Sequence, residues 1–596
     1  MCGVSDGPLA TTDARVPLVV GITGHRDIRA EDRDALERRV RGILLNLRKE
    51  YPATPLILLS PLAEGADRLA ARAALDGRVG ARLIVPLPMS QALYEEDFTS
   101  PGSLEEFREL LGKAHRSFAI PLAPGNTEAA IRARGELRDR QYEAVGKYIA
   151  QQSQILIALW DGTDKGLVGG TASIVRFKTQ GMVEPQPQPH RSLLEPAECG
   201  PVYHVVTPRA SGHSPEQKPF DLNTVYPKAH KDRSQAERYF QKIFQNMDEF
   251  NREALNAGPG LGAMVVKSKA HVIPPDKESM LPLSLRSILD SYGLADALAI
   301  RFQRKTVGTM KSLHVLVFFV VLCFAIFAHY HAPWFMIPSA LLVGSAFFVY
   351  RRAKARGYQD KYQDYRALAE GLRVKLFWRL AGVFDEVTDH YLGKSRTELD
   401  WIRHALRGWG LTVPDEGGFG SHPESPGTRA AMNLVLTHWV RDQQRYFARA
   451  GRKAHQSLEG LERWVAAFIG LAALLTVFAI VVPSVAYVRE HGPRGCCGEE
   501  GWLLPGAIVA ISTSLLAAGL VHHIGEQMAF SEHWKQYARM ERLFAHASGL
   551  ITQAIAVGDL RRAQALVREL GREALAENGD WVLLHRERPL TVPHAS

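Results

Sequence analysis

The sequence is poor in cysteine, with five among its 596 residues, and this excludes a small scaffold built on disulfide bonds. Charged residues are 23% and apolar residues 46% of the chain, which excludes a disordered or collagen-like protein. Residues 1–16 contain no long apolar run, so no secretory signal peptide is expected there. No basic run is interleaved with aromatic residues, so nucleic acid is not an expected partner.

Lysine, arginine, aspartate and glutamate are absent from four long stretches. These stretches are residues 313–328, 334–350, 464–488 and 502–521. A membrane-spanning helix needs about 20 apolar residues, with a range of roughly 17–25. The first two stretches are short enough to be the buried core of a soluble helical bundle. All four are apolar on every face rather than along one stripe, which favours four transmembrane helices in two hairpins.

Basic residues flank the predicted hairpins on one side. They are Arg301, Arg304, Lys305 and Lys311 before the first hairpin, Arg351, Arg352, Lys354 and Arg356 after it, and Arg449, Arg452, Lys453 and Arg463 before the second. The tip at 329–333 has no Lys or Arg. Lys and Arg are retained on the cytoplasmic side of a membrane, so a multi-pass topology with both termini in the cytoplasm is expected, with the lipid bilayer as a partner.

The N-terminal third alternates short buried strands with helices. Strands are expected at 18–20, 55–60, 81–87 and 154–160, with a further one at 202–206. Residues 31–49 carry apolar side chains at three-to-four spacing, which predicts a helix. This alternation is typical of an α/β, Rossmann-like, doubly wound parallel sheet, in which ligands bind outside the carboxyl ends of the strands.

Three glycine-bearing turns follow the predicted strands, and glycine lets backbone N–H groups approach a phosphate. The candidate ligand-binding residues in these turns are Gly24, His25, Arg26, Glu64, Gly65, Asp67, Arg68, Asp161, Gly162, Gly169, Gly170 and Thr171. Arg26 offers a bidentate fork to phosphate, with His25 beside it. Glu64, Asp67, Asp97 and Asp161 are candidate acceptors of ribose hydroxyls, or caps and turn residues. A tight turn or a surface salt bridge is the alternative for each motif taken alone.

Two of these turns carry a family resemblance. Residues 60–75, Ser-Pro-Leu-Ala-Glu-Gly-Ala-Asp-Arg-Leu-Ala-Ala-Arg-Ala-Ala-Leu, resemble the Ser-Gly-Leu-Ala-x-Gly-Ile-Asp segment of DNA-processing protein A. Gly169-Gly170-Thr171 resembles the Pro-Gly-Gly-x-Gly-Thr-x-x-Glu loop of the LOG phosphoribohydrolases. The resemblance covers about residues 15–180, includes Tyr142-x-x-x-Gly146, and implies a SLOG-superfamily domain that binds a nucleotide-derived ligand such as a cyclic nucleotide or ADP-ribose derivative.

The chain departs from the hydrolase pattern at one decisive position. Alignment of Gly170-Thr171 with the family motif places Ile174 where the catalytic Glu belongs, and isoleucine cannot act as an acid or base. No catalytic residue is therefore expected, and a sensor is favoured over an enzyme. The alternative is a membrane-tethered nucleotide N-glycosidase that uses Glu64 or Asp67. No metal site is expected, since His190, His204 and His213 lack ligand spacing and are expected in solvated loops.

Residues 181–234 are rich in Pro, His and Ser and are expected to be linker, and the chain after 235 is expected to be helical. Its two halves are weakly alike: Tyr365 and Tyr537 follow the hairpins at similar spacing, and Asp400-Trp401 and Asp580-Trp581 come later. This order predicts a tandem repeat.

The segment Tyr365-Arg-Ala-Leu-Ala-Glu-Gly-Leu-Arg373 after the first hairpin resembles SLATT domains, over about 285–410 and more loosely over 440–590. Those are two-transmembrane effectors that accompany nucleotide sensors in bacterial conflict systems. The resemblance implies an antiphage effector of the bacterial inner membrane, in which a second messenger controls a pore formed by a homo-oligomer. A ligand-binding scaffold that is merely anchored by its hairpins is the further alternative. The expected organisation is a SLOG-like domain at 1–210, a linker and helical connector at 211–284, and hairpin units at 285–430 and 431–596.

Overall fold

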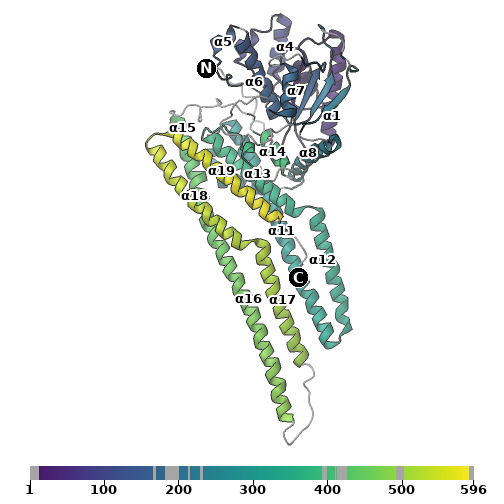
Figure 1. Ribbon diagram of the computed structural model, residues 1–596, viewed down its shortest axis with the longest axis vertical. Helices are drawn as coiled ribbons and strands as arrows, with labels where there is room; N and C mark the ends of the chain where they lie inside the picture. The colour runs from purple at the N-terminus through teal and green to yellow at the C-terminus, as the bar shows by residue number, and fades with distance from the viewer. Residues whose placement is uncertain are drawn as a thin grey trace. The chain divides into compact units, whose positions relative to one another are not determined.

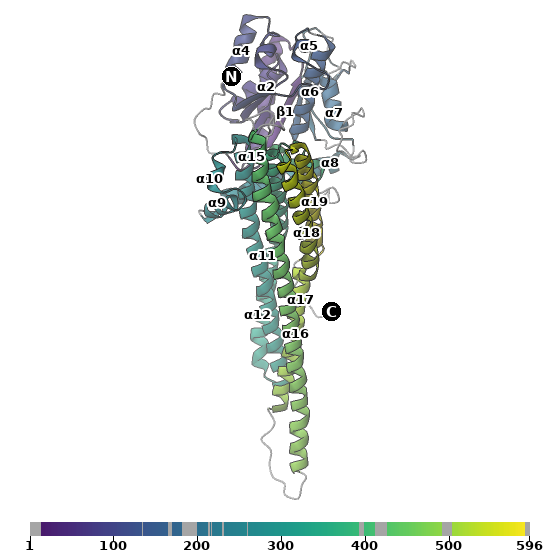
Figure 2. The same cartoon turned by 90° about the vertical axis from the view of Figure 1, so that its left-hand side faces the viewer.

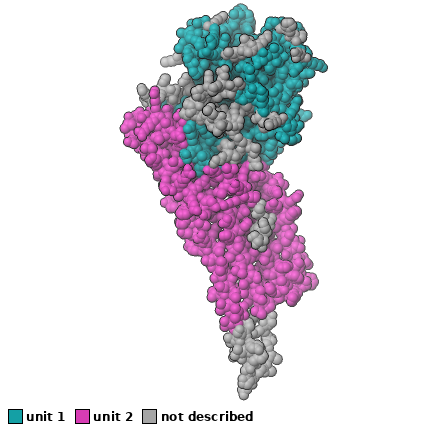
Figure 3. All heavy atoms as spheres, viewed as in Figure 1, with its two compact units in different colours: residues 1–296, 367–431, 571–579 teal, residues 297–366, 432–570, 580–596 magenta. Residues whose placement is uncertain are grey.

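The computed structural model describes residues 13–133, 135–164, 170–181, 200–211, 215, 217–228, 232–258, 260–391, 399–409, 411, 426–490 and 503–589. The chain divides into two compact units that are not contiguous in sequence (Figure 3). Unit 1 comprises Met1–Asp296, Ala367–Ala431 and Gly571–Gly579, and unit 2 comprises Ala297–Arg366, Met432–Leu570 and Asp580–Ser596.

Unit 1 contains the β-sheet that is drawn at the upper right of Figure 1. This sheet has seven strands in the order β4-β3-β2-β1-β5-β6-β7. The strands are β1 (Leu18–Gly24), β2 (Leu56–Leu59), β3 (Arg82–Leu87), β4 (Arg116–Ala119), β5 (Ile155–Trp160), β6 (Val202–Val206) and β7 (Leu222–Val225). All neighbouring pairs are parallel except β6 with β7, which is antiparallel. The predicted α/β sheet is confirmed. It extends beyond residue 210, because β7 lies inside the segment expected to be linker.

Helices cover the sheet and explain why its central strands are continuously apolar. They are α1 (Arg33–Glu50), α2 (Ala66–Leu75), α3 (Gln91–Glu95), α4 (Pro101–Gly112), α5 (Glu128–Arg132), α6 (Glu136–Gln152) and α7 (Thr171–Gln180). Val145 and Ile149 of α6 and Ile174 of α7 pack with Val19 and Leu156 in one buried cluster. A parallel sheet buries both faces in this way.

The chain order creates a switch point beside β1. Strands β2, β3 and β4 extend the sheet on one side of β1, whereas β5 pairs with its other side. The connections on the two sides of β1 therefore diverge at the carboxyl ends of β1 and β5, which is where ligands bind in open α/β sheets.

The opposite, amino-terminal edge of the sheet is held by later helices of unit 1. Asn251 of α8 (Arg233–Leu255) accepts a hydrogen bond from the Val16 N–H and donates one to the Val16 carbonyl, both at 2.8 Å. Gln154 donates to the His404 carbonyl of α14 (Asp400–Gly408) at 2.7 Å. The sequence 233–255, expected to be a connector, is thus an integral layer of the sheet unit.

The remaining helices include the membrane candidates. They are α9 (Gly260–Val272), α10 (Pro275–Glu278), α11 (Leu283–Tyr330), α12 (Met336–Ala355), α13 (Tyr358–Leu380), α15 (Pro426–Val435), a π-helical turn (Leu436–Val440), α16 (Arg441–Glu490), α17 (Leu503–Met528), α18 (Phe530–Ala556) and α19 (Leu560–Arg586). Within the described ranges, four helical segments are long and apolar enough to cross a membrane, and only 6–17% of their apolar windows is buried. Apolar surface left exposed on this scale fits contact with lipid. Helices α16 and α17 lie side by side (Figure 1 and Figure 2).

Unit 2 contains a matched pair of backbone breaks. Gly357 separates α12 from α13 with φ +57°, and Ala529 separates α17 from α18 with φ +51°. Each lies eight residues before one of the paired tyrosines, Tyr365 and Tyr537, which pack on Phe302 and Phe447 with centroid distances of 5.6 and 5.8 Å. The tryptophans have different neighbours. Trp401 packs near Phe250 and Trp581 on Tyr362.

Candidate functional site

A pocket of about 100 Å³ opens at the carboxyl end of β1. Its walls come from β1, the β2–α2 connection, α3, α6 and the start of α7. The lining residues are Ile22, Thr23, Gly24, Arg26, Pro61, Ala63, Asp67, Tyr94, Tyr142, Val145, Gly146, Ile149, Thr171 and Ile174. This pocket lies at the edge of the sheet where the sequence predicted a ligand site, and four of the twelve candidate residues line it: Gly24, Arg26, Asp67 and Thr171.

Two glycines allow the β1 and β2 connections to approach each other closely. A Cβ on Gly24 would lie 2.5 Å from the Ala66 Cβ and 2.7 Å from the Leu159 carbonyl oxygen. Gly65 has φ +80°, and a Cβ there would lie 2.4 Å from the His25 carbonyl oxygen. That conformation favours glycine. Gly65 thus shapes the turn that starts α2 without itself lining the pocket.

Arg26 is the cation that lines the pocket. Its guanidinium lies over the Tyr142 ring with 4.8 Å between Cζ and the ring centroid, and among the described residues it forms no ion pair within 4.0 Å. Tyr142 is held in turn, because its hydroxyl donates to Asp97, which also pairs with Arg138 at 2.7 Å. The Arg26 side chain is exposed, so its fork can meet an incoming anion.

Asp67 is the pocket's buried carboxyl, with only 7% of the residue exposed. Burial raises its pKa to about 7, opposed by the charge of Arg26, a hydrogen bond from the Ala63 N–H, and the charge of Arg68. Tyr94, 1% exposed, also lines the pocket. Its hydroxyl has no hydrogen-bond partner within the described part of the chain. Both groups can therefore serve a ligand as hydrogen-bond partners.

The start of α7 supplies backbone donors. Gly170 caps this helix without a side-chain hydrogen bond, and Thr171 in its first turn lines the pocket. The first N–H groups of a helix have no intrahelical partner and carry partial positive charge, which suits an anion. Ile174, one turn later, is 2% exposed and packs against α6, where a Cβ on Gly146 would lie 2.7 Å from Ile174 Cδ1.

His25 and Asp161 form a separate cluster and do not line the pocket. The buried His25 Nε2 accepts a hydrogen bond from the Asp161 N–H at 3.0 Å and another from Arg209 Nε at 3.2 Å. Arg209 also pairs with the Asp161 carboxylate at 3.1 Å. Burial and the Arg209 charge lower the His25 pKa to about 4. His25 is therefore neutral and ties β1 to β5. Gly162, with φ +86°, forms the adjacent turn.

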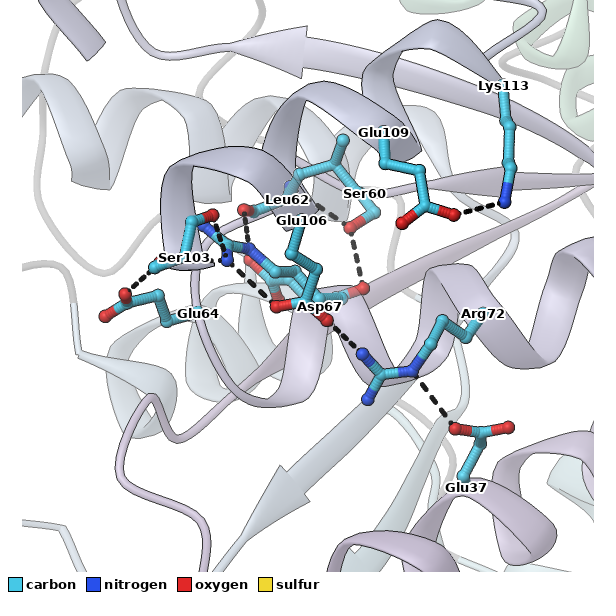
Figure 4. Close-up of polar contacts among 11 residues, drawn as sticks. Glu37, Ser60, Leu62, Glu64, Asp67, Arg72, Ser103, Glu106, Glu109 and Lys113 are labelled. Carbon is cyan, nitrogen blue, oxygen red and sulfur yellow. Dashed lines mark hydrogen bonds and ion pairs between the residues drawn. The ribbon is translucent and has the colours of Figure 1, made fainter. Parts of the chain in front are cut away.

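Glu64 points toward Ser103 (Figure 4), and Arg68 joins the same network through a hydrogen bond to the Ser103 hydroxyl at 2.9 Å. Glu64 is exposed and accepts a hydrogen bond from Ser103. Arg68 is 2% exposed and donates to the Leu62 carbonyl at 3.1 Å, to Ser103 and to Glu106 at 3.0 Å. These contacts hold the β2–α2 connection against α4. Neither side chain lines the pocket.

Gly169 and His204 are the sequence predictions that remain to be placed. Gly169 lies outside the described residues, and His204, expected in a solvated loop, is instead buried in β6, where its Nε2 lies 2.9 Å from the Trp160 carbonyl oxygen. Tyr94, Thr23 and Arg209 were not among the residues expected from the sequence. Thr23 could have been found from its place at the end of a strand, whereas Tyr94 and Arg209 reach their positions only through tertiary packing.

No protein-family model matches the chain, and a comparison with curated proteins likewise gave no match.

Proposed function

We propose that unit 1 is a receptor for a phosphate-bearing, nucleotide-derived ligand, and that the protein is a ligand-controlled membrane effector. The observation that carries the proposal is the pocket at the carboxyl end of β1, which is lined by the Arg26 guanidinium, stacked on Tyr142, and by the first turn of α7. A guanidinium and a helix N-terminus are the two groups best suited to phosphate. The pocket volume is below the roughly 300–1,000 Å³ of whole-ligand sites, so the phosphate-bearing part would enter it.

The membrane half of the proposal is supported by four apolar helices and their basic flanks. On this account the ligand controls a pore or membrane disruption by a homo-oligomer in a bacterial antiphage system. The chain would lie in the inner membrane with both termini cytoplasmic. The resemblances to SLOG and SLATT domains supply the ligand class and the effector role. The ligand's base is left open because the pocket's charged groups address phosphate.

The binding half is tested with the purified full-length protein in detergent. Isothermal titration is carried out with ADP-ribose, AMP and cyclic adenine and guanine nucleotides. The account predicts that at least one binds, and that Arg26→Ala weakens that binding about tenfold or more, since hydrogen bonds to charged groups contribute about 1.5–3 kcal/mol. Arg39→Ala, at an exposed position of α1, is the matched control. An equal loss in both variants, or no binding by any nucleotide, would remove the receptor proposal.

A second candidate function is a membrane-tethered nucleotide N-glycosidase. It is favoured by one observation, the buried Asp67 in the pocket with its pKa near 7, which suits a general acid. Glu64, the other acid considered, lies outside the pocket lining. Chromatography of nucleotides incubated with the protein decides between the two. Release of free base that is lost in Asp67→Asn would establish the enzyme, and intact nucleotide would exclude it for the panel.

A further inference from the structure

Asp67 is placed so that its charge opposes an anionic ligand. Its carboxyl lines the same cavity as Arg26 and Thr171, and the residue is 93% removed from solvent, as the complement of its 7% exposure. Within the described part of the chain it forms no ion pair shorter than 4.0 Å. A buried carboxylate without a close cation is unstable and tends to take up a proton.

The charged and titratable groups around Asp67 come from four elements. Arg26 follows β1, Tyr94 lies on α3, Tyr142 on α6, and Arg68 on α2 itself. Arg68 is already engaged by the Leu62 carbonyl, Ser103 and Glu106. Arg26 is consequently the only cation facing Asp67 that is free of another carboxylate among the described residues. The charge of Arg26 favours the ionised form of Asp67. A phosphate bound by Arg26 would neutralise that charge and would therefore favour the protonated form of Asp67.

We propose that binding of an anionic ligand in this pocket is coupled to the uptake of one proton by Asp67. The inference rests on the proposed receptor function. The proton comes from solvent and adds to the Asp67 carboxylate. The occupied pocket then holds the negative charge of the ligand without the negative charge of Asp67. The resulting carboxylic O–H is a donor that an ionised Asp67 lacks. The ligand therefore binds more tightly as the pH falls from 8 to 6, by up to about tenfold over the whole range, because Asp67 in the empty pocket is itself mostly protonated at pH 6.

The test is isothermal titration of the full-length protein with ADP-ribose at pH 7.5 in HEPES and in Tris, which differ in ionisation enthalpy. ADP-ribose is chosen because its pyrophosphate has no proton equilibrium near neutral pH, whereas a phosphate monoester has one near 6. The expected result is uptake of roughly 0.5–0.7 proton per ADP-ribose bound, because Asp67 with a pKa of about 7 is already about one quarter protonated at pH 7.5. Asp67→Asn should bind ADP-ribose with no proton uptake. Glu64→Gln, an exposed carboxylate on the same connection, should behave as the wild type.

The outcomes separate the two claims. Binding without proton uptake in the wild type would overturn the coupling and leave the receptor proposal standing. Equal uptake in Asp67→Asn would assign the proton to another group and would also overturn it. Failure of ADP-ribose to bind at all would count against the receptor proposal for this ligand class, and the coupling would fall with it.

A ligand-free measurement supports or contradicts the same assignment. A carboxyl whose pKa is raised on folding stabilises the protein below its unfolded pKa, and that stability is lost as the pH rises through 7. Asp67→Asn should therefore raise the thermal unfolding midpoint at pH 8 by a few degrees and change it little at pH 4. An unchanged midpoint at pH 8 would contradict the burial of an ionisable group at this position.

Discussion

The Arg26 guanidinium stacks on the ring of Tyr142, 4.8 Å from its centroid, and this contact joins the loop after β1 to helix α6. Tyr142 is itself fixed by Asp97 and, through Asp97, by Arg138. The stacking orients a cation that forms no ion pair within 4.0 Å among the described residues. The ring thus prepares the guanidinium for an anion before any ligand arrives, which lowers the ordering cost of binding.

Removal of the Tyr142 ring should weaken nucleotide binding, although the positive charge of Arg26 remains. A cation–π contact at a partly exposed site contributes about 0.5–1 kcal/mol, so Tyr142→Leu should raise the Kd of a bound nucleotide about two- to fivefold. Tyr142→Phe keeps the ring and should stay within about twofold of wild type. Isothermal titration measures both. The positioning role is wrong if the Phe variant binds as weakly as the Leu variant.

Replacement of His25 should reduce stability rather than ligand contact. His25→Leu leaves the Asp161 N–H without its partner, which costs about 1–3 kcal/mol and should lower the thermal unfolding midpoint at pH 7.5. His115→Leu, at an exposed position, serves as the control.

The pH dependence of His25 has the opposite sign to that of Asp67. The folded pKa of His25, about 4, lies below its usual 6.5, so its stabilising contribution is present above 6.5 and is lost as the pH falls toward 4. The wild type should lose stability across this range, and His25→Leu should lose less. Parallel curves would show that His25 is not the titrating group.

A side chain at Gly65 should deform the pocket. Alanine at φ +80° is strained by about 1–2 kcal/mol, and its Cβ would meet the His25 carbonyl oxygen at 2.4 Å. Gly65→Ala should therefore abolish detectable nucleotide binding and lower the unfolding midpoint. Gly77→Ala places its Cβ in open space and should change neither property. Wild-type binding by Gly65→Ala would contradict the assigned shape of the turn.

The predicted topology can be tested with the chain's own cysteines. Cys496 and Cys497 lie between the second pair of apolar stretches, whereas Cys2 and Cys199 lie in the N-terminal part. A membrane-impermeant maleimide applied to spheroplasts should label the wild type, and Cys496→Ser with Cys497→Ser should abolish labelling. Labelling of Cys2 or Cys199 in intact spheroplasts would place the N-terminal part outside and reverse the orientation.

The sequence predicted those parts of the fold that depend on local apolar pattern. Central strands such as β1 and β5 are continuous buried runs, and the apolar stretches carry no charge over their whole length. Strands β4 and β7 were missed because edge strands carry little apolar signal: β4 reads Arg-Ser-Phe-Ala and β7 Leu-Asn-Thr-Val. The packing of α8 against the sheet was not predicted, because no local sequence pattern indicates that Asn251 accepts a hydrogen bond from the Val16 N–H.

The pocket lies at the edge of the sheet that the sequence indicated, but only some of the candidate residues line it. Ligands in open α/β sheets bind at the carboxyl ends of the strands, and this rule selects the pocket residues that end a strand, follow one or begin the next helix. They are Gly24, Arg26, Asp67 and Thr171. The same rule also selected His25, Glu64, Arg68 and Asp161, which satisfy neighbouring groups instead of lining the pocket. Whether a polar residue in a turn faces a ligand or a protein partner depends on side-chain packing, which a single sequence does not encode locally.

The most direct test of the account is dye leakage from liposomes containing the purified full-length protein, with the nucleotide panel added one compound at a time. The account predicts leakage with at least one nucleotide, its loss in Arg26→Ala, and normal leakage in Arg39→Ala. Ligand binding without leakage would reduce the hairpins to an anchor for a binding scaffold. Leakage that is equal with and without every nucleotide, and equal in Arg26→Ala, would contradict control of the membrane helices by the pocket.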